Sequence, residues 1–255
     1  MRILCVLALI GLGLCGVGCK SKEFVPEPPK LTSYSTREFE WDEVQRIVLM
    51  PLANRSNVPA AAAQVQQALV AELQKSGRFE VVLGRNDSQD PRTEEVFASG
   101  RFDEEQLLHV KHRYQAQGVL FVQITQYSGF NPPQLGLSML LVSPAEAVVI
   151  AAVDGLWDMR EAGTLARARH YAGQNLNFPD SLFGDDRILD SPQTFQRFVA
   201  YEISQVIETA TLKANANGGA MGVPEALVTS PVPNGASYTP VSQQQPAMVP
   251  SAEEQ

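Results

Sequence analysis

Apolar runs alternate with segments of helical spacing between about residue 44 and residue 213. Continuous apolar runs bounded by turn signals predict buried strands. They fall at Arg46–Met50, Arg78–Leu83, Gly118–Tyr127, Leu135–Val142 and Val148–Met159. Three other segments carry apolar residues on one helical face. They follow residue types that favour helix N-termini, namely Ser56, Asp103 and Ser191. The predicted element order is therefore βαβαβββα.

This order predicts the fold class. Strand–helix–strand crossovers favour parallel pairing, whereas the later run of three strands favours antiparallel pairing. We therefore expect an α/β (α+β) domain in which helices pack against a mixed sheet of about five strands. In the last helix, the apolar stripe predicts that Phe198 and Ile203 lie in the core. Arg197 and Gln205 fall on the opposite face and are expected to contact water.

The first 18 residues have the pattern of a signal peptide. Arg2 precedes the apolar stretch Ile3–Val17, which is shorter than the roughly 20 residues that a membrane-spanning helix needs. The segment Gly11–Gly16 also fits G-x-G-x-x-G, the dinucleotide-binding fingerprint. That fingerprint requires a preceding strand and a following helix, but Lys20–Lys30 is charged and rich in proline. The sequence therefore predicts export rather than a cofactor site.

All three cysteines lie at or before position 19. Val17-Gly18-Cys19 resembles the lipobox of bacterial lipoproteins, although Gly16 stands where that family usually has Leu. The resemblance implies that Cys19 becomes the N-terminus and carries acyl chains such as palmitate. Lys20 replaces the Asp that would signal inner-membrane retention in enterobacteria, which favours the outer membrane. Ordinary cleavage that leaves a free cysteine is the alternative. In either case the mature chain has no disulfide and no thiolate metal cluster.

Composition divides the chain into four parts. Residues 1–18 form the signal peptide, and residues 19–43 are expected to form a lipidated, flexible tether because they are rich in proline and charge. Residues 44–213 form the α/β domain. Residues 214–255 are rich in Pro, Gln and Ser, and this composition predicts disorder. The formal net charge of −8, without basic clusters, argues against nucleic acid or an anionic membrane surface as a partner.

Histidines and aspartates are the candidates for chemistry. His109 and His112 are three residues apart on a predicted helix and could share a metal ion. Because the nearby carboxylates are limited to Glu104 and Glu105, without an H-E-x-x-H pattern, we expect solvated side chains and no metal site. His170 is expected at the surface or at a strand edge.

Asp154 and Asp158 lie at even positions of one predicted strand and should project to the same face. Paired carboxylates of this kind could serve a glycan hydrolase. Trp157 is the one aromatic residue nearby, so we favour solvent-facing strand positions. No catalytic, cofactor-binding or metal-binding residue is predicted, and we expect a protein that is not an enzyme.

Three motifs at the predicted strands belong together, namely Met50-Pro51-Leu52, Gly77-Arg78-Phe79 with Arg85, and Gly118-Val119-Leu120 through Ile124-Thr125. They resemble the periplasmic domain of CsgG-like lipoproteins, whose architecture is related to that of the activator LpoB and the N-terminal domain of TolB. Gln123 departs from the glycine usual in the third motif, and no insertion for pore-forming hairpins is evident. The resemblance implies the fold and the periplasmic compartment.

Together these features predict a lipid-anchored, non-enzymatic module of the cell envelope. We expect it on the periplasmic face of the outer membrane, held by the lipid at Cys19, with envelope proteins as partners and no cofactor. A homo-oligomer is an open alternative. Two alternative functions remain at this stage, namely a subunit of an oligomeric secretion channel and an envelope glycan hydrolase that uses Asp154 and Asp158.

Overall fold

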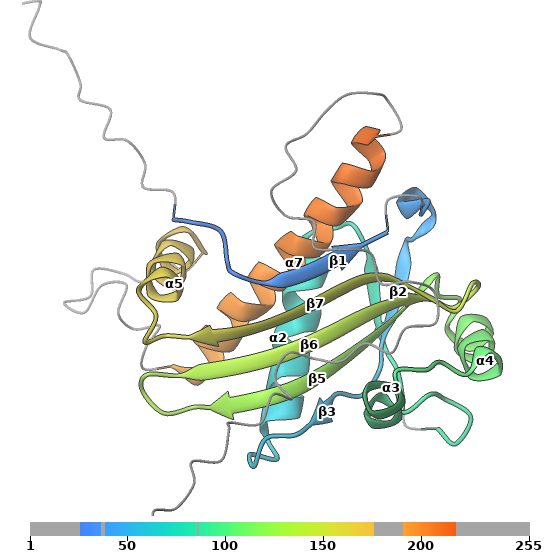
Figure 1. Ribbon diagram of the computed structural model, residues 1–255, viewed down its shortest axis with the longest axis horizontal. Coiled ribbons are helices and arrows are strands. Elements are labelled where there is room, and N and C mark those ends of the chain that lie inside the picture. The colour runs from blue at the N-terminus through green and yellow to red at the C-terminus, as the bar shows by residue number, and fades with distance from the viewer. Residues whose placement is uncertain (1–25, 37–38, 86, 176–190, 218–255) are drawn as a thin grey trace, which may run out of the picture.

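The computed structural model describes residues 26–36, 39–85, 87–175 and 191–217 (Figure 1). Its centre is a mixed, seven-stranded sheet in the order β1-β7-β6-β5-β2-β4, with β3 paired to β5 beside β2. The strands are β1 (Thr32–Ser35), β2 (Arg46–Leu49), β3 (Ala53–Asn54), β4 (Glu80–Leu83), β5 (Gly118–Ser128), β6 (Gln134–Ser143) and β7 (Val148–Asp158).

The pairing follows the predicted division of the sheet. Strand β2 pairs in parallel with both β4 and β5, whereas β5, β6 and β7 form an antiparallel meander. The α/β class and the mixed sheet are therefore confirmed. The expectation of about five strands was too low. Strands β1 and β3 have four and two residues, which is too short for a period-two pattern to emerge.

Helices cover both faces of the sheet (Figure 1). The helical elements are η1 (Trp41–Glu43), α2 (Ala61–Lys75), α3 (Thr93–Ser99), α4 (Glu104–Tyr114), α5 (Ala162–Asn175) and α7 (Pro192–Asn217). The core is divided accordingly. One apolar cluster lies between the sheet and helices α2, α5 and α7, and a second lies beneath α3 and α4. No helix within the described ranges is both long and apolar enough to cross a bilayer.

Two of the three predicted helix starts are confirmed. The Asp103 carboxylate accepts hydrogen bonds from the backbone amides of Glu105 and Gln106, as an N-cap does. The hydroxyl of Ser191 accepts from the Thr194 amide at 3.3 Å. Ser56 does not cap α2, which begins at Ala61; its hydroxyl donates instead to the side chain of Asn54 at the end of β3.

The tether prediction is wrong for its C-terminal part. Strand β1 pairs with β7, with Thr32 opposite Asp154 and Ser35 opposite Ala151. The side chain of Trp41 is fully buried in the larger core cluster. A chain without apolar periodicity still folds here because the edge of β7 offers backbone partners and the core offers a site for one indole. At the other boundary, α7 runs to Asn217 rather than ending at residue 213.

The signal peptide, Cys19 and nearly all of the predicted tail lie outside the described residues. The structure adds α3 and α5, neither of which was predicted as a helix. His170, expected at the surface or at a strand edge, lies on α5 and is half-buried, so the strand-edge alternative is wrong. The small apolar residues of α5 do not form a wide stripe, and only packing against α7 and β7 reveals its buried face.

The last helix packs largely as its apolar stripe predicts. Phe198 and Ile203 are buried, and Gln205 is exposed. Arg197 differs from the prediction, because its Nε lies 3.4 Å from Oε1 of Glu72, whose side chain is 3% exposed. Oε1 of Glu72 also forms an ion pair with Lys75 Nζ at 2.6 Å, and it accepts a hydrogen bond from the Tyr171 hydroxyl at 3.4 Å. Burial raises the pKa of Tyr171 to about 12, and the negative charge of Glu72 acts in the same direction, so this phenol remains a donor.

Candidate functional site

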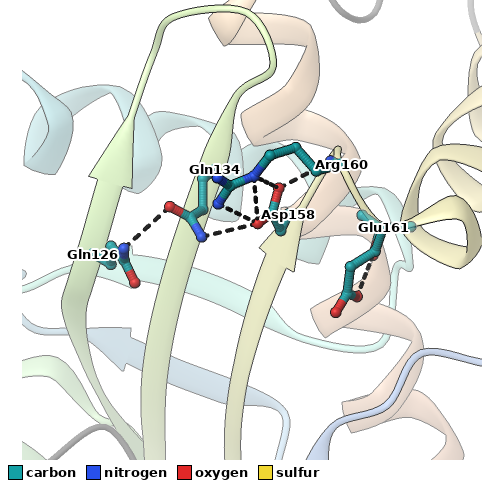
Figure 2. A network of polar contacts seen from close by, with 6 residues as sticks. Gln126, Gln134, Asp158, Arg160 and Glu161 are labelled. Atoms are coloured by element: carbon teal, nitrogen blue, oxygen red, sulfur yellow. Dashed lines mark hydrogen bonds and ion pairs between the residues drawn. The ribbon is translucent and has the colours of Figure 1, made fainter. Parts of the chain in front are cut away.

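The two aspartates singled out in the sequence share one face of β7, as their spacing predicts. Both side chains are partly buried and each has its own partners. The Ser138 hydroxyl donates to Asp154 Oδ1 at 2.6 Å. Asp158 is bound by Arg160 Nη2 at 2.6 Å and by Gln134 Nε2 at 3.2 Å (Figure 2).

This arrangement does not suit an acid/base pair. The two aspartates are four positions apart on the strand, a separation of about 13 Å, whereas paired glycosidase carboxyl groups lie about 5–9.5 Å apart. A general acid also needs a raised pKa. The hydrogen bond from Arg160 instead holds the pKa of Asp158 below its ordinary value. The geometry therefore assigns both aspartates to sheet structure, and it argues against the hydrolase alternative.

Asp158 belongs to a row of polar side chains that crosses three strands (Figure 2). Gln126 on β5 donates from Nε2 to Oε1 of Gln134 on β6 at 3.1 Å, and Gln134 donates in turn to Asp158 on β7. Arg160 completes the row from the β7–α5 connection. We call these four residues, Gln126, Gln134, Asp158 and Arg160, the polar row. Gln126, Gln134 and Asp158 lie near the ends of their strands, so the row links the three strands of the antiparallel meander at that edge of the sheet.

The two neighbouring histidines have different surroundings. His112 is exposed, whereas His109 Nε2 lies 3.8 Å from Oδ1 of Asp90. The Asp90 side chain is 1% exposed and belongs to the connection between β4 and α3. Within the described ranges, no group of three or more His, Cys, Asp or Glu side chains is placed to hold a metal ion.

Charged side chains join this connection to α4. Arg113 Nη1 contacts Asp87 Oδ2 at 2.6 Å and Asp90 Oδ2 at 3.5 Å. The hydrogen bond between Arg113 and Asp87 lowers the pKa of the aspartate and raises the pKa of the guanidinium, so both stay charged. Asp90 Oδ1 and His109 Nε2 are buried without a hydrogen-bond partner. These two atoms lie 3.8 Å from each other, which is beyond hydrogen-bond distance, although buried polar atoms are nearly always hydrogen-bonded.

A hollow of about 420 Å³ lies next to this cluster, between α3 and α4. We call it the α3–α4 hollow. Its size falls within the usual range of ligand sites. Its lining combines both signs of charge, an amide and apolar surface, and includes Arg92, Glu95, Val96, Arg101, Phe102 and Gln106. The ring of Phe102 stacks on the buried Phe121 with centroids 6.1 Å apart, so the apolar floor is continuous with the core.

The lining of the α3–α4 hollow offers charged and apolar groups that could contact a ligand. Ser99 is the hydroxyl residue in its lining, and this hydroxyl donates to the Glu95 backbone carbonyl at 2.8 Å rather than to a base. Arg92 and Glu95 lie 3.7 Å apart and both are largely exposed, so each can also pair with charges from outside. The arrangement fits a polypeptide segment with charges of both signs and an apolar side chain.

Sequence reasoning identified His109 but missed Asp90 and the hollow. Asp90 lies in an irregular polar stretch where no periodicity marks a buried residue. Its burial depends on how the β4–α3 connection folds over α4, and no local pattern encodes that contact. A carboxylate directly before Pro91 and near a helix start was the one available signal.

The fold and this site define an α/β domain with a mixed sheet and a small hollow between two peripheral helices. No protein-family model and no curated protein matches the chain. Solved structures that resemble it in part include the PelC dodecamer from Paraburkholderia phytofirmans, with 13% identity, coverage of 53% of this chain and 86% of that chain, and a TM-score of 0.38.

Bacterial lipoproteins are also among the similar structures. Lipoprotein GNA1162 from Neisseria meningitidis matches with 14% identity, 52% coverage of this chain and 99% of that chain, and a TM-score of 0.32. The LpoB C-terminal domain from Escherichia coli matches with 13% identity, coverage of 46% of this chain and 98% of that chain, and a TM-score of 0.30. LpoB was also named in the sequence resemblance. Its structural similarity is too low to assign its activity or its partners to this chain.

Proposed function

We propose that this protein is a lipid-anchored, non-enzymatic interaction module of the cell envelope. Acyl chains on Cys19 hold it at the outer membrane, and the domain faces the periplasm. The Cys19 pattern at the end of the apolar leader supports the anchor, and the lipoproteins among the similar structures are compatible with it. The partner is an envelope protein that binds through the α3–α4 hollow.

One observation carries the assignment to binding. The α3–α4 hollow presents Arg92, Glu95 and Arg101 to solvent around the half-buried ring of Phe102. Charged groups at the rim steer and align a partner, while the apolar centre supplies affinity. By contrast, the carboxylates that a hydrolase would use are bound to Ser138 and Arg160.

Site-specific photocrosslinking in living cells tests this function. A photoreactive amino acid at Gln106, which lines the hollow, should give a crosslinked band that mass spectrometry identifies as an envelope protein. The same amino acid at Gln205, which is exposed on α7, serves as the matched control and should not give that band. Arg101→Glu should weaken the Gln106 crosslink because it reverses one rim charge. Equal crosslinking from both positions would contradict a binding site in the hollow.

The same experiment addresses self-association. A band at twice the mass of the chain, containing peptides of this protein alone, would identify a second copy as the occupant of the hollow. The mass of the detergent-solubilised protein would then distinguish a dimer from the large ring that a secretion channel requires.

A further inference from the structure

Phe130 exposes more of its side chain than any other large apolar residue in the described part of the chain. It is 86% exposed, whereas Leu83, Leu108 and Leu156 are 41–49% exposed. It lies in the connection between β5 and β6, which consists of Gly129, Phe130, Asn131, Pro132 and Pro133 and contains no charged residue. Exposing an aromatic ring to water costs free energy in proportion to its apolar area, so a ring presented this far from the core favours an apolar partner.

Three connections of the chain meet at this end of the sheet. Gln134, directly after the Phe130 connection, pairs with Asp158 at the end of β7. Strand β1 runs antiparallel to β7, and its first residue, Thr32, lies opposite Asp154. The segment that leads back to Cys19 therefore leaves the domain on the side of Phe130. Figure 1 shows β1 entering from the same side as the β5–β6 connection and α5, with α4 at the opposite end.

The anchor lies within reach of this end. Cys19 and Leu31 are 12 residues apart in the sequence, a span of at most about 42 Å when fully extended. This reach allows an acylated Cys19 to bring the Phe130 end of the sheet to the bilayer. The net acidic chain cannot rely on charge to approach anionic lipids, but the uncharged β5–β6 connection carries no electrostatic penalty there. Arg160 of the polar row is 65% exposed at the same end and can meet lipid phosphate groups.

We propose that this end of the sheet lies against the membrane and that Phe130 enters the bilayer interface. The ring would then sit near the boundary of headgroups and acyl chains, about 5–10 Å deep, as apolar residues of interfacial segments do. This inference rests on the anchoring at Cys19 in the proposed function. It adds an orientation, because the α3–α4 hollow then points away from the membrane and towards partners in the periplasm.

Tryptophan fluorescence in vesicles tests the proposal. The full acylated chain is reconstituted into phosphatidylcholine vesicles as Phe130→Trp and, as a matched control, as Leu108→Trp on α4. Trp41 and Trp157 are fully buried and give the same background in both variants. Vesicles without bromine should shift the added emission of Phe130→Trp to shorter wavelength, and lipids with brominated acyl chains should quench it. Neither should change the added emission of Leu108→Trp. Thermal melting of both variants confirms that each is folded.

Vesicle flotation separates this inference from the anchoring. A chain that floats with the vesicles while Phe130→Trp is quenched no more than Leu108→Trp would overturn the membrane contact and leave the anchor intact. Such a result would indicate that Phe130 meets a protein instead. A chain that does not float would overturn the anchoring itself, and the orientation of the domain with it.

Discussion

The indole nitrogen of Trp157 donates a 2.6 Å hydrogen bond to Oε2 of Glu202, joining β7 to α7 across 45 residues of sequence. Arg167 on α5 completes the arrangement, with its Nε 2.6 Å from the other carboxylate oxygen. All three side chains are largely buried. Glu202 thus connects a strand and two helices, and each of its oxygens satisfies a donor that would otherwise be buried alone.

Replacement of Glu202 by Gln should destabilise the protein by about 3–5 kcal/mol, because it removes the counter-charge of a buried guanidinium. Burial raises the pKa of Glu202 even though Arg167 and Trp157 lower it. The folded protein therefore binds this proton more tightly than the unfolded chain does, and the contribution of Glu202 to stability increases as pH falls towards the ordinary value of 4.5. Denaturant titrations from about pH 8 to about pH 4.5 measure both effects.

In that comparison, the parent protein should gain stability relative to Glu202→Gln as the pH is lowered. All other carboxyl groups are common to both proteins, so the difference between the two stability curves reports on Glu202 alone. Parallel stability curves across the pH range would contradict a raised pKa for Glu202.

Trp41 tests whether the domain begins before residue 44. Its side chain is fully buried, and its ring meets that of Phe39 edge to face with centroids 5.5 Å apart. Trp41→Ala should cost about 3–5 kcal/mol, through lost burial and the cavity left behind. Glu43→Ala, two residues further on and exposed, should change stability by less than about 0.5 kcal/mol. Urea titration measures the free energy of unfolding of both variants. A Trp41→Ala variant as stable as the parent protein would mean that this segment is part of a flexible tether after all.

Phe198 and Gln205 test the orientation of α7. Phe198 is 1% exposed and packs against Tyr171 and Phe195. Phe198→Ala should cost about 3–5 kcal/mol. The side-chain amide of Gln205 donates to Glu208 at 3.1 Å on the exposed face, so Gln205→Ala should cost less than about 0.5 kcal/mol. Equal unfolding midpoints for the two variants would mean that α7 does not bury its apolar stripe.

Cys19 is the predicted acylation site. Cys19→Ser should release the protein from membrane fractions, because the anchor depends on acyl chains attached to that sulfur. Cys15→Ser lies within the signal peptide and should stay membrane-bound. Fractionation of cells followed by immunoblotting measures both. Release of Cys15→Ser together with retention of Cys19→Ser would mean that the lipid is attached to Cys15 and that the prediction for Cys19 is wrong.

The sequence by itself determined the elements that have a strong local pattern. The apolar run at Gly118–Tyr127 is strand β5, and the predicted cap at Asp103 begins α4. The stripe of the last helix buries Phe198 as expected. These features could be predicted because burial on one face imposes a period of 2 or 3.6 residues on neighbouring positions. The α/β class followed from their order.

Tertiary structure decided what depends on contacts between distant residues. Strand β1 exists because the edge of β7 accepts it, and Arg197 is paired because α2 brings Glu72 to it. The same is true of the site. Arg167 and Glu202 are 35 positions apart in the sequence and Asp90 and His109 are 19 apart, and only the packing of the helices and connections brings each pair together. Hydrogen bonds and ion pairs of this kind depend on strand register and helix placement, which no local pattern of apolar residues records.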